Sequence, residues 1–211
     1  MVTPYRRWTT STRPALEREG RPVPRRWATF SLLCICVTCG LSAQTPEAWE
    51  LAARRIRRLP PDSFPQLPIA IRSALTARGC SVPQSFTSDQ PHNVIAGSFE
   101  RAGQQDWAVL CSHHDSSSIF IFWASAEARP PTEVARASDA GFLQGIGSGR
   151  IGYSRLLTVA SPAQIRQYAA SFGGPLPKVL DHDGVEDAFA GKGSTVSYLE
   201  GGRWLALTGV D

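Results

Sequence analysis

Apolar residues recur at helical spacing in three segments, each of which carries residues that begin or end helices. The first predicted helix starts at Thr45 and ends at the pair Pro60-Pro61. The second follows the proline-rich stretch 62–68 and ends at Gly79, since glycine tolerates a left-handed backbone. The third starts at the capping box 161–164. Their apolar faces are Trp49, Ala52, Ile56 and Leu59; Leu67, Ile71, Ala74 and Leu75; and Ile165, Tyr168, Ala169 and Phe172.

The rest of the chain alternates apolar and polar residues at strand period. The predicted strands are 93–99, 106–111, 119–125 and 153–160, an edge strand around 133–135, and a hairpin of 194–199 with 203–207. Short connections between strands favour antiparallel pairing. We therefore expect an α+β fold, with two N-terminal helices and one later helix packed against one face of an antiparallel β-sheet of about five to seven strands.

The first 43 residues have the order of a secretory signal peptide with a disordered basic leader. Arg25-Arg26 is followed by the apolar run 27–37 and then by small residues. This run is shorter than the roughly 20 apolar residues that a membrane-spanning helix needs. We expect cleavage after Ala43, which leaves residues 44–211 as a single domain that is periplasmic or secreted. The alternative is an uncleaved membrane anchor.

The net charge of +4 comes from the leader. Seven of the 22 Lys and Arg residues, but two of the 18 acidic residues, lie before residue 44, so the predicted domain is nearly neutral. This balance argues against nucleic acid as a partner. We expect an unknown protein or another envelope component as the partner, and no stable membrane insertion after signal cleavage.

The cysteines support an oxidising compartment. Cys34, Cys36 and Cys39 lie in the leader, which leaves Cys80 and Cys111 in the predicted domain. An even pair in an exported chain predicts one disulfide, which would join the end of the second helix to a strand. The alternative is two separately buried thiols, because spacing alone does not show that the two residues meet.

The stretch 180–189 concentrates charge, and we expect it to form a loop. It holds the candidate metal ligands Asp181, Asp183, Glu186 and Asp187, and Gly184 allows the sharp turn that brings carboxylates together. Hard carboxylate oxygens are the ligands that calcium prefers. The alternative is an acidic turn whose side chains bind their own backbone and solubilise the entry to the final hairpin.

The spacing Asp-x-Asp-Gly-x-x-Asp in this stretch resembles the calcium loops of FG-GAP and VCBS repeats. Upstream, 97–99 and 106–110 resemble the strand framework of the same repeats. The upstream copy has Glu100, Arg101 and Gln104 where the repeats place Asp, and two partial copies cannot close a propeller. The resemblance therefore implies a local calcium site at 181–187 and not a whole fold.

The four histidines suggest a second metal chemistry. His92, His113, His114 and His182 all lie in polar segments, with Asp115 and Asp183 close by in the sequence. Zinc accepts histidine and carboxylate ligands, so convergence of these segments would make a metal-dependent hydrolase. No pair has the spacing of a known zinc motif, and ordinary surface histidines are the alternative.

Two other segments resemble anion-binding sequences. The arginines at 54, 55, 57 and 58 form a basic run, but on a short amphipathic helix a solvated face explains them. The glycine-rich stretch 145–152 lacks the helix that a nucleotide loop must open, so we expect a flexible surface loop. No pattern identifies a catalytic mechanism, and no catalytic residue is assigned. We expect a binding or interaction module, with the metal-dependent hydrolase as the alternative.

Overall fold

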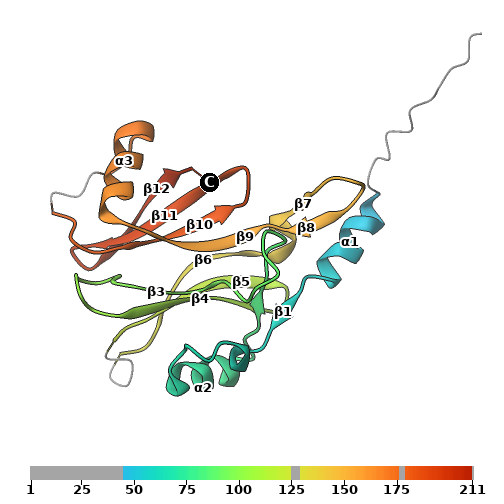
Figure 1. Cartoon of the computed structure of the whole chain (residues 1–211), viewed down its shortest axis with the longest axis horizontal. Helices are drawn as coiled ribbons and strands as arrows, with labels where there is room; N and C mark the ends of the chain where they lie inside the picture. The colour runs from blue at the N-terminus through green and yellow to red at the C-terminus, as the bar shows by residue number, and fades with distance from the viewer. Residues whose placement is uncertain (1–44, 125–128, 176–178, 211) are drawn as a thin grey trace, which may run out of the picture. The chain divides into compact units, whose positions relative to one another are not determined.

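The computed structural model describes residues 45–124, 129–175 and 179–210, which form two facing β-sheets with helices on their outer faces (Figure 1). The predicted signal peptide, residues 1–43 with its three cysteines, lies outside the described residues, and its cleavage remains a prediction. None of the described helices is long and apolar enough to cross a membrane.

The first large sheet is an antiparallel meander in the order β3-β4-β5-β6. Its strands are β3 (Val94–Gly97), β4 (Asp106–His113), β5 (Ser116–Phe122) and β6 (Thr132–Ser138). The four strands predicted in this half of the sequence are confirmed, with shifted ends. The predicted edge strand is β6, which pairs only with β5 in the described sheet.

The second large sheet is another antiparallel meander, in the order β12-β11-β10-β9. Its strands are β9 (Arg155–Ala160), β10 (Gly184–Phe189), β11 (Gly193–Glu200) and β12 (Arg203–Gly209). The predicted hairpin is confirmed as β11 and β12. The prediction of a loop over 180–189 is wrong from Gly184 onward, because those residues pair with strands on both sides.

The inner faces of the two sheets pack against each other and form the main core. The first sheet contributes Leu110 and Ile121, and the second contributes Leu157 and Val185, all of them buried in one cluster. Trp49 and Ala52 of helix α1 (Pro46–Arg54) pack against the same cluster.

Each outer face carries a helix, so the order of layers is helix, sheet, sheet, helix (Figure 1). Ile71 and Leu75 of α2 (Ile69–Ala77) pack with Val109 on the first sheet. Ile165 of α3 (Pro162–Phe172) packs with Val196 on the second sheet. The expected single sheet with all helices on one face is therefore wrong, while the α+β class stands.

Strand β4 gives the physical reason for the second sheet. Ala108 and Leu110 point to the inner core, and Val109 and Cys111 point to α2, all four being buried. A strand that is apolar on both faces needs a covering layer on both sides. Helix α2 covers one side, and the second sheet covers the other.

Smaller elements complete the described fold. They are β1 (Arg58–Leu59) paired with β2 (Val82–Pro83), β7 (Leu143–Gly145) paired with β8 (Ile151–Tyr153), and the 3₁₀ helices η1 (Pro61–Ser63) and η2 (Asp139–Phe142). The single strand predicted for 153–160 is instead divided between β8 and β9.

The disulfide between Cys80 and Cys111 is confirmed, with the two Cα atoms 5.3 Å apart. Gly79, at φ 65°, ends α2 as expected and turns the chain toward β4. The bond therefore fixes the C-terminal end of α2 to the outer face of the first sheet.

Candidate functional site

The last two of the predicted calcium ligands lie in strand β10 and point to opposite faces of it. Asp187 faces the core and binds the guanidinium of Arg155, with Nε and Nη2 each 2.8 Å from a carboxylate oxygen. Glu186 faces the other side and accepts hydrogen bonds from the hydroxyls of Thr158 and Ser194, at 3.0 and 2.5 Å. A strand alternates its side chains, so these two carboxylates do not converge.

The first two predicted ligands lie just before β10. Asp183 joins the sheets: its Oδ2 accepts the backbone N–H of Ser98 at 2.9 Å, and its own N–H donates to the Ser98 carbonyl at 2.7 Å. Asp181 is exposed, and its Oδ1 lies 3.1 Å from Nδ1 of His182. In the described ranges, no three His, Cys, Asp or Glu side chains gather as a metal site requires. Calcium binding at 181–187 stays a prediction without geometric support.

The histidines also occupy separate positions. His92 Nε2 accepts the backbone N–H of Ser85 at 2.6 Å, and His182 is buried with Nε2 2.7 Å from the carbonyl oxygen of Leu199. His113 ends β4 and His114 begins the turn to β5, with their ring centroids 3.8 Å apart. Asp115 in the same turn binds Arg58. The expected convergence of these residues on Asp183 is not supported by any of these contacts.

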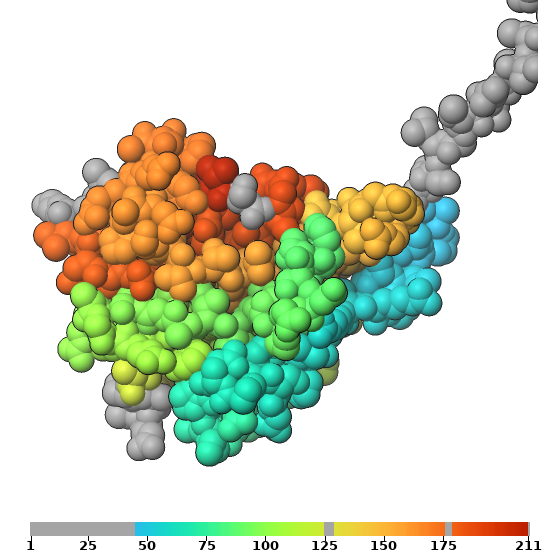
Figure 2. All heavy atoms as spheres, viewed as in Figure 1, coloured from blue at the N-terminus to red at the C-terminus, as the bar shows by residue number. Residues whose placement is uncertain are grey.

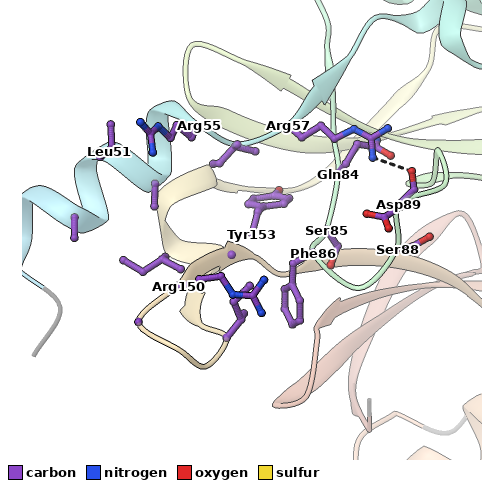
Figure 3. A pocket seen from close by; sticks show the side chains of 17 residues that line it. Leu51, Arg55, Arg57, Gln84, Ser85, Phe86, Ser88, Asp89, Arg150 and Tyr153 are labelled. Atoms are coloured by element: carbon purple, nitrogen blue, oxygen red, sulfur yellow. Dashed lines mark hydrogen bonds between the residues drawn. The ribbon is translucent and has the colours of Figure 1, made fainter. Parts of the chain in front are cut away.

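A cleft of about 480 Å³ lies elsewhere, where α1, the loop 84–89 and the β7–β8 hairpin meet (Figures 2 and 3). In Figure 2 these segments are blue, green and yellow-orange. The volume falls within the range of small-molecule sites. Its lining combines the arginines Arg55, Arg57 and Arg150 with Asp89 and with apolar side chains.

The first wall forms because α1 ends earlier than the apolar periodicity predicts. The helix stops at Arg54, and Leu59 lies in strand β1 opposite Val82, so the prediction of a helix up to Leu59 is wrong. The turn between helix and strand places Arg55 and Arg57 at the rim of the cleft, where both are exposed. Pairing with β2 outweighs helical periodicity over these last residues.

The second wall is the loop 84–89, which is held by hydrogen bonds at several points. The N–H of Gln84 donates to the Arg57 carbonyl, and the N–H of Phe86 donates to the Tyr153 carbonyl, both at 2.8 Å. The side chain of Gln84 both donates to and accepts from the backbone of His92, at 3.0 and 2.9 Å. These bonds position the loop before any ligand arrives.

The third wall is the β7–β8 hairpin. The flexible loop expected over the glycine-rich stretch is instead a paired hairpin with a tight turn, in which Gly147 and Gly149 have φ 85° and 70°. Gly152 lets the walls approach each other, because a Cβ there would lie 2.9 Å from the Cβ of Phe86. The glycines therefore shape the cleft and bind no phosphate by a nucleotide motif.

The cleft combines positive charge with exposed apolar surface. Arg57 Nη1 donates to the backbone carbonyl of Asp89 at 2.9 Å, and Arg150 points toward Phe86 (Figure 3). Phe86 and Leu51 are 43% and 39% exposed, although both are large apolar residues.

Tyr153 lies at the base of the cleft. Its ring is buried, and its hydroxyl lies 3.4 Å from Oγ of Ser117. Burial raises the pKa of the Tyr153 phenol, with a further contribution from the nearby charge of Asp139. The phenol is therefore neutral at physiological pH, and it acts as a wall and not as a base.

The sequence contained part of the signal for this site. Arg55 and Arg57 belong to the basic run that suggested phosphate binding. The run alone does not indicate which other segments of the chain line the cleft. Phe86 is distant in the sequence and lies in no recognised motif, and Arg150 lies in the glycine-rich stretch 145–152, for which a surface loop was expected. Comparison with protein-family models, curated proteins and solved structures finds no match to this chain, so the resemblance to FG-GAP and VCBS repeats stays an untested prediction.

Proposed function

We propose that this protein is a periplasmic or secreted binding module whose cleft takes a ligand that combines an anionic group with an apolar or aromatic part. The observation that carries the proposal is the placement of three arginines around exposed Phe86 and Leu51, on walls fixed by backbone hydrogen bonds. The Cys80–Cys111 disulfide supports an oxidising compartment.

The charge of the cleft favours an anion. Three guanidinium groups and one carboxylate line it, so its net charge is positive although the domain is nearly neutral. Guanidinium groups match carboxylate and phosphate oxygens and are less strongly hydrated than ammonium groups. An anion in the cleft gains charge-assisted hydrogen bonds at modest desolvation cost.

The apolar surface of the cleft favours a ligand that has an apolar or aromatic part besides its anionic group. Phe86 and Leu51 expose apolar area beside the arginines, and a ligand ring or alkyl chain would remove that area from water. Small-molecule sites commonly combine such apolar walls with a few polar groups that fix orientation.

Binding, without chemistry, is the function that these residues support. The lining residues supply no histidine, no cysteine and no glutamate, and the phenol of Tyr153 has a raised pKa. The metal-dependent hydrolase has no convergent ligand set among the residues that the structure describes.

The test uses three probes that separate the two requirements: phenyl phosphate, inorganic phosphate and benzyl alcohol. Amide NMR of the disulfide-bonded full chain should show the tightest binding for phenyl phosphate, with shifts at Phe86, Asp89 and Gly149. Raising the salt concentration should weaken this binding, because the arginines are exposed.

Variants locate the site. Arg57→Gln and Arg150→Gln should each weaken phenyl phosphate binding about tenfold, as expected for loss of a charge-assisted hydrogen bond. Arg54→Gln is the matched control, since Arg54 lies outside the cleft and pairs with Glu50 on the exposed side of α1. Equal losses in all three variants, or shifts scattered over the surface, would contradict the proposal.

A further inference from the structure

The two large sheets have four edge strands, and three of these edges are protected from pairing with another strand. Strand β6 carries Glu133 and Arg136 and is interrupted at Ala135, where φ is 54° and the pairing with β5 changes register. Charges and bulges of this kind protect an edge from pairing with another strand.

The edges of β9 and β3 lie next to each other and are covered by side chains. The Asn93 side chain accepts the N–H of Leu157 at 2.9 Å and donates to the Arg155 carbonyl at 3.1 Å, which occupies the edge of β9. Strand β3 is short, and Asp183 binds the backbone of Ser98 just beyond its end. Neither edge therefore presents a long row of unpaired backbone N–H and C=O groups to another strand.

From Trp204 to Thr208, the edge of β12 has no such protection among the described residues, although just beyond it the Tyr168 hydroxyl donates to the Val210 carbonyl at 3.1 Å. In the part of the chain that the structure describes, β12 pairs with β11 alone. The two-residue turn at 201–202 makes Glu200 and Arg203 a hydrogen-bonded pair. By alternation, the N–H and C=O groups of Trp204, Ala206 and Thr208 point away from β11. From Trp204 to Val210 the edge carries no charged residue and no proline.

This edge is complementary to itself. If two copies of β12 pair antiparallel about a twofold axis at Ala206, then Trp204 of each copy lies opposite Thr208 of the other, and Leu205 lies opposite Leu207. The outward-pointing N–H and C=O groups of one copy then lie opposite the outward-pointing groups of the other copy and can form hydrogen bonds with them. Arg203 lies opposite Gly209, so no like charges face each other. The Leu205 and Leu207 side chains continue the apolar face that α3 covers in each copy.

We propose that β12 is a dimerisation edge, through which two copies of this chain join their second sheets into one continuous sheet. A twofold interface of this kind is closed, because each copy offers the same strand to the other. The dimer leaves the arginine cleft untouched, since no cleft-lining residue belongs to β12.

Sedimentation equilibrium of the full chain, from low to high micromolar concentration, tests the proposal. The parent protein should show a reversible monomer–dimer equilibrium. Ala206→Lys places two lysines opposite each other at the twofold axis and should raise the dimer dissociation constant at least about tenfold. Ala206 is exposed, so the substitution should leave the melting temperature of the monomer unchanged.

Charge reversal provides the sharper test. Ala206→Glu alone should also be monomeric, and a mixture of Ala206→Lys with Ala206→Glu should form a heterodimer. Ala96→Lys, an alanine-to-lysine change at an exposed position of β3, is the matched control and should dimerise like the parent. A monomeric parent, a dimer that survives Ala206→Lys, or a mixture that fails to associate would each overturn the proposal.

Discussion

Arg155 and Asp187 form a two-bond ion pair between neighbouring strands of the second sheet, with Nε–Oδ1 and Nη2–Oδ2 distances of 2.8 Å. The Arg155 side chain is fully buried and that of Asp187 is 10% exposed. Nη1 donates to the carbonyl and hydroxyl oxygens of Ser117 at 2.9 Å, and Nη2 also donates to the Ala135 carbonyl. All the guanidinium donors are therefore used, and they join β9 and β10 to both β5 and β6.

Removing one partner of this pair should destabilise the fold strongly. Asp187→Ala leaves a buried guanidinium without its counter-charge, and we expect a loss of about 3–5 kcal/mol in the free energy of unfolding. Urea unfolding measures it. Arg155→Met combined with Asp187→Ala should cost less than the sum of the single changes, because the double variant leaves no unpaired charge. A loss below about 1 kcal/mol in Asp187→Ala would contradict the role that we assign to the pair.

The disulfide should contribute mainly by restricting the unfolded chain. Cys80 and Cys111 are separated by 31 residues, which corresponds to roughly 3–4 kcal/mol in the chain-entropy description. Replacing both cysteines by serine should lower the free energy of unfolding by about that amount. The reduced parent protein is the control and should match the double variant. A loss near zero would mean that packing of α2 alone fixes this region.

Calcium should not stabilise the protein. Glu186 and Asp187 lie on opposite faces of β10, and Asp183 is engaged with the backbone of Ser98. Melting temperatures with millimolar calcium and with EDTA should therefore agree. A specific ion at 100 times its dissociation constant would add about 2.7 kcal/mol. A calcium-dependent rise that disappears in Asp183→Asn would instead support the calcium site that the sequence predicts.

Alkaline pH should weaken the fold through Tyr153. Burial raises the pKa of this phenol in the folded state, so stability is fully present below the unfolded pKa of about 10 and falls as pH rises above it. Tyr153→Phe should flatten the decline in the free energy of unfolding over that alkaline range. An unchanged slope in Tyr153→Phe would assign the decline to other groups.

The elements that the sequence predicted well are those determined by local contacts. The capping box at Ser161 and Gln164 is present with both of its hydrogen bonds, and Gly79 adopts the left-handed backbone that ends α2. The hairpin of β11 and β12 follows from alternation around two glycines. Each of these signals lies within a few residues, where physical constraints are strongest.

The errors arise where distant segments meet. Alternation in β4 shows that both faces are apolar, but not which layer covers each face. The sequence did not predict strand β10, because Glu186 and Asp187 made the segment resemble an exposed acidic loop. Their burial depends on distant partners such as Ser194 and Arg155. The cleft joins residues near 55, 86 and 150, and no local pattern connects them.

Because each large sheet takes its strands from one continuous part of the chain, assembly can proceed in order from the N-terminus. Cys80, Cys111 and α2 all precede β9 in the chain, so the outer face of the first sheet can be covered and the disulfide formed before the second sheet folds. The inner face, with Leu110 and Ile121, is covered only in part by residues of the N-terminal segment, such as Trp49, until Leu157 and Val185 join the core. The chain is therefore most prone to misassembly and aggregation before the second sheet folds. The disulfide stabilises the outer face of the first sheet, whereas the inner face is the one that is exposed at that stage.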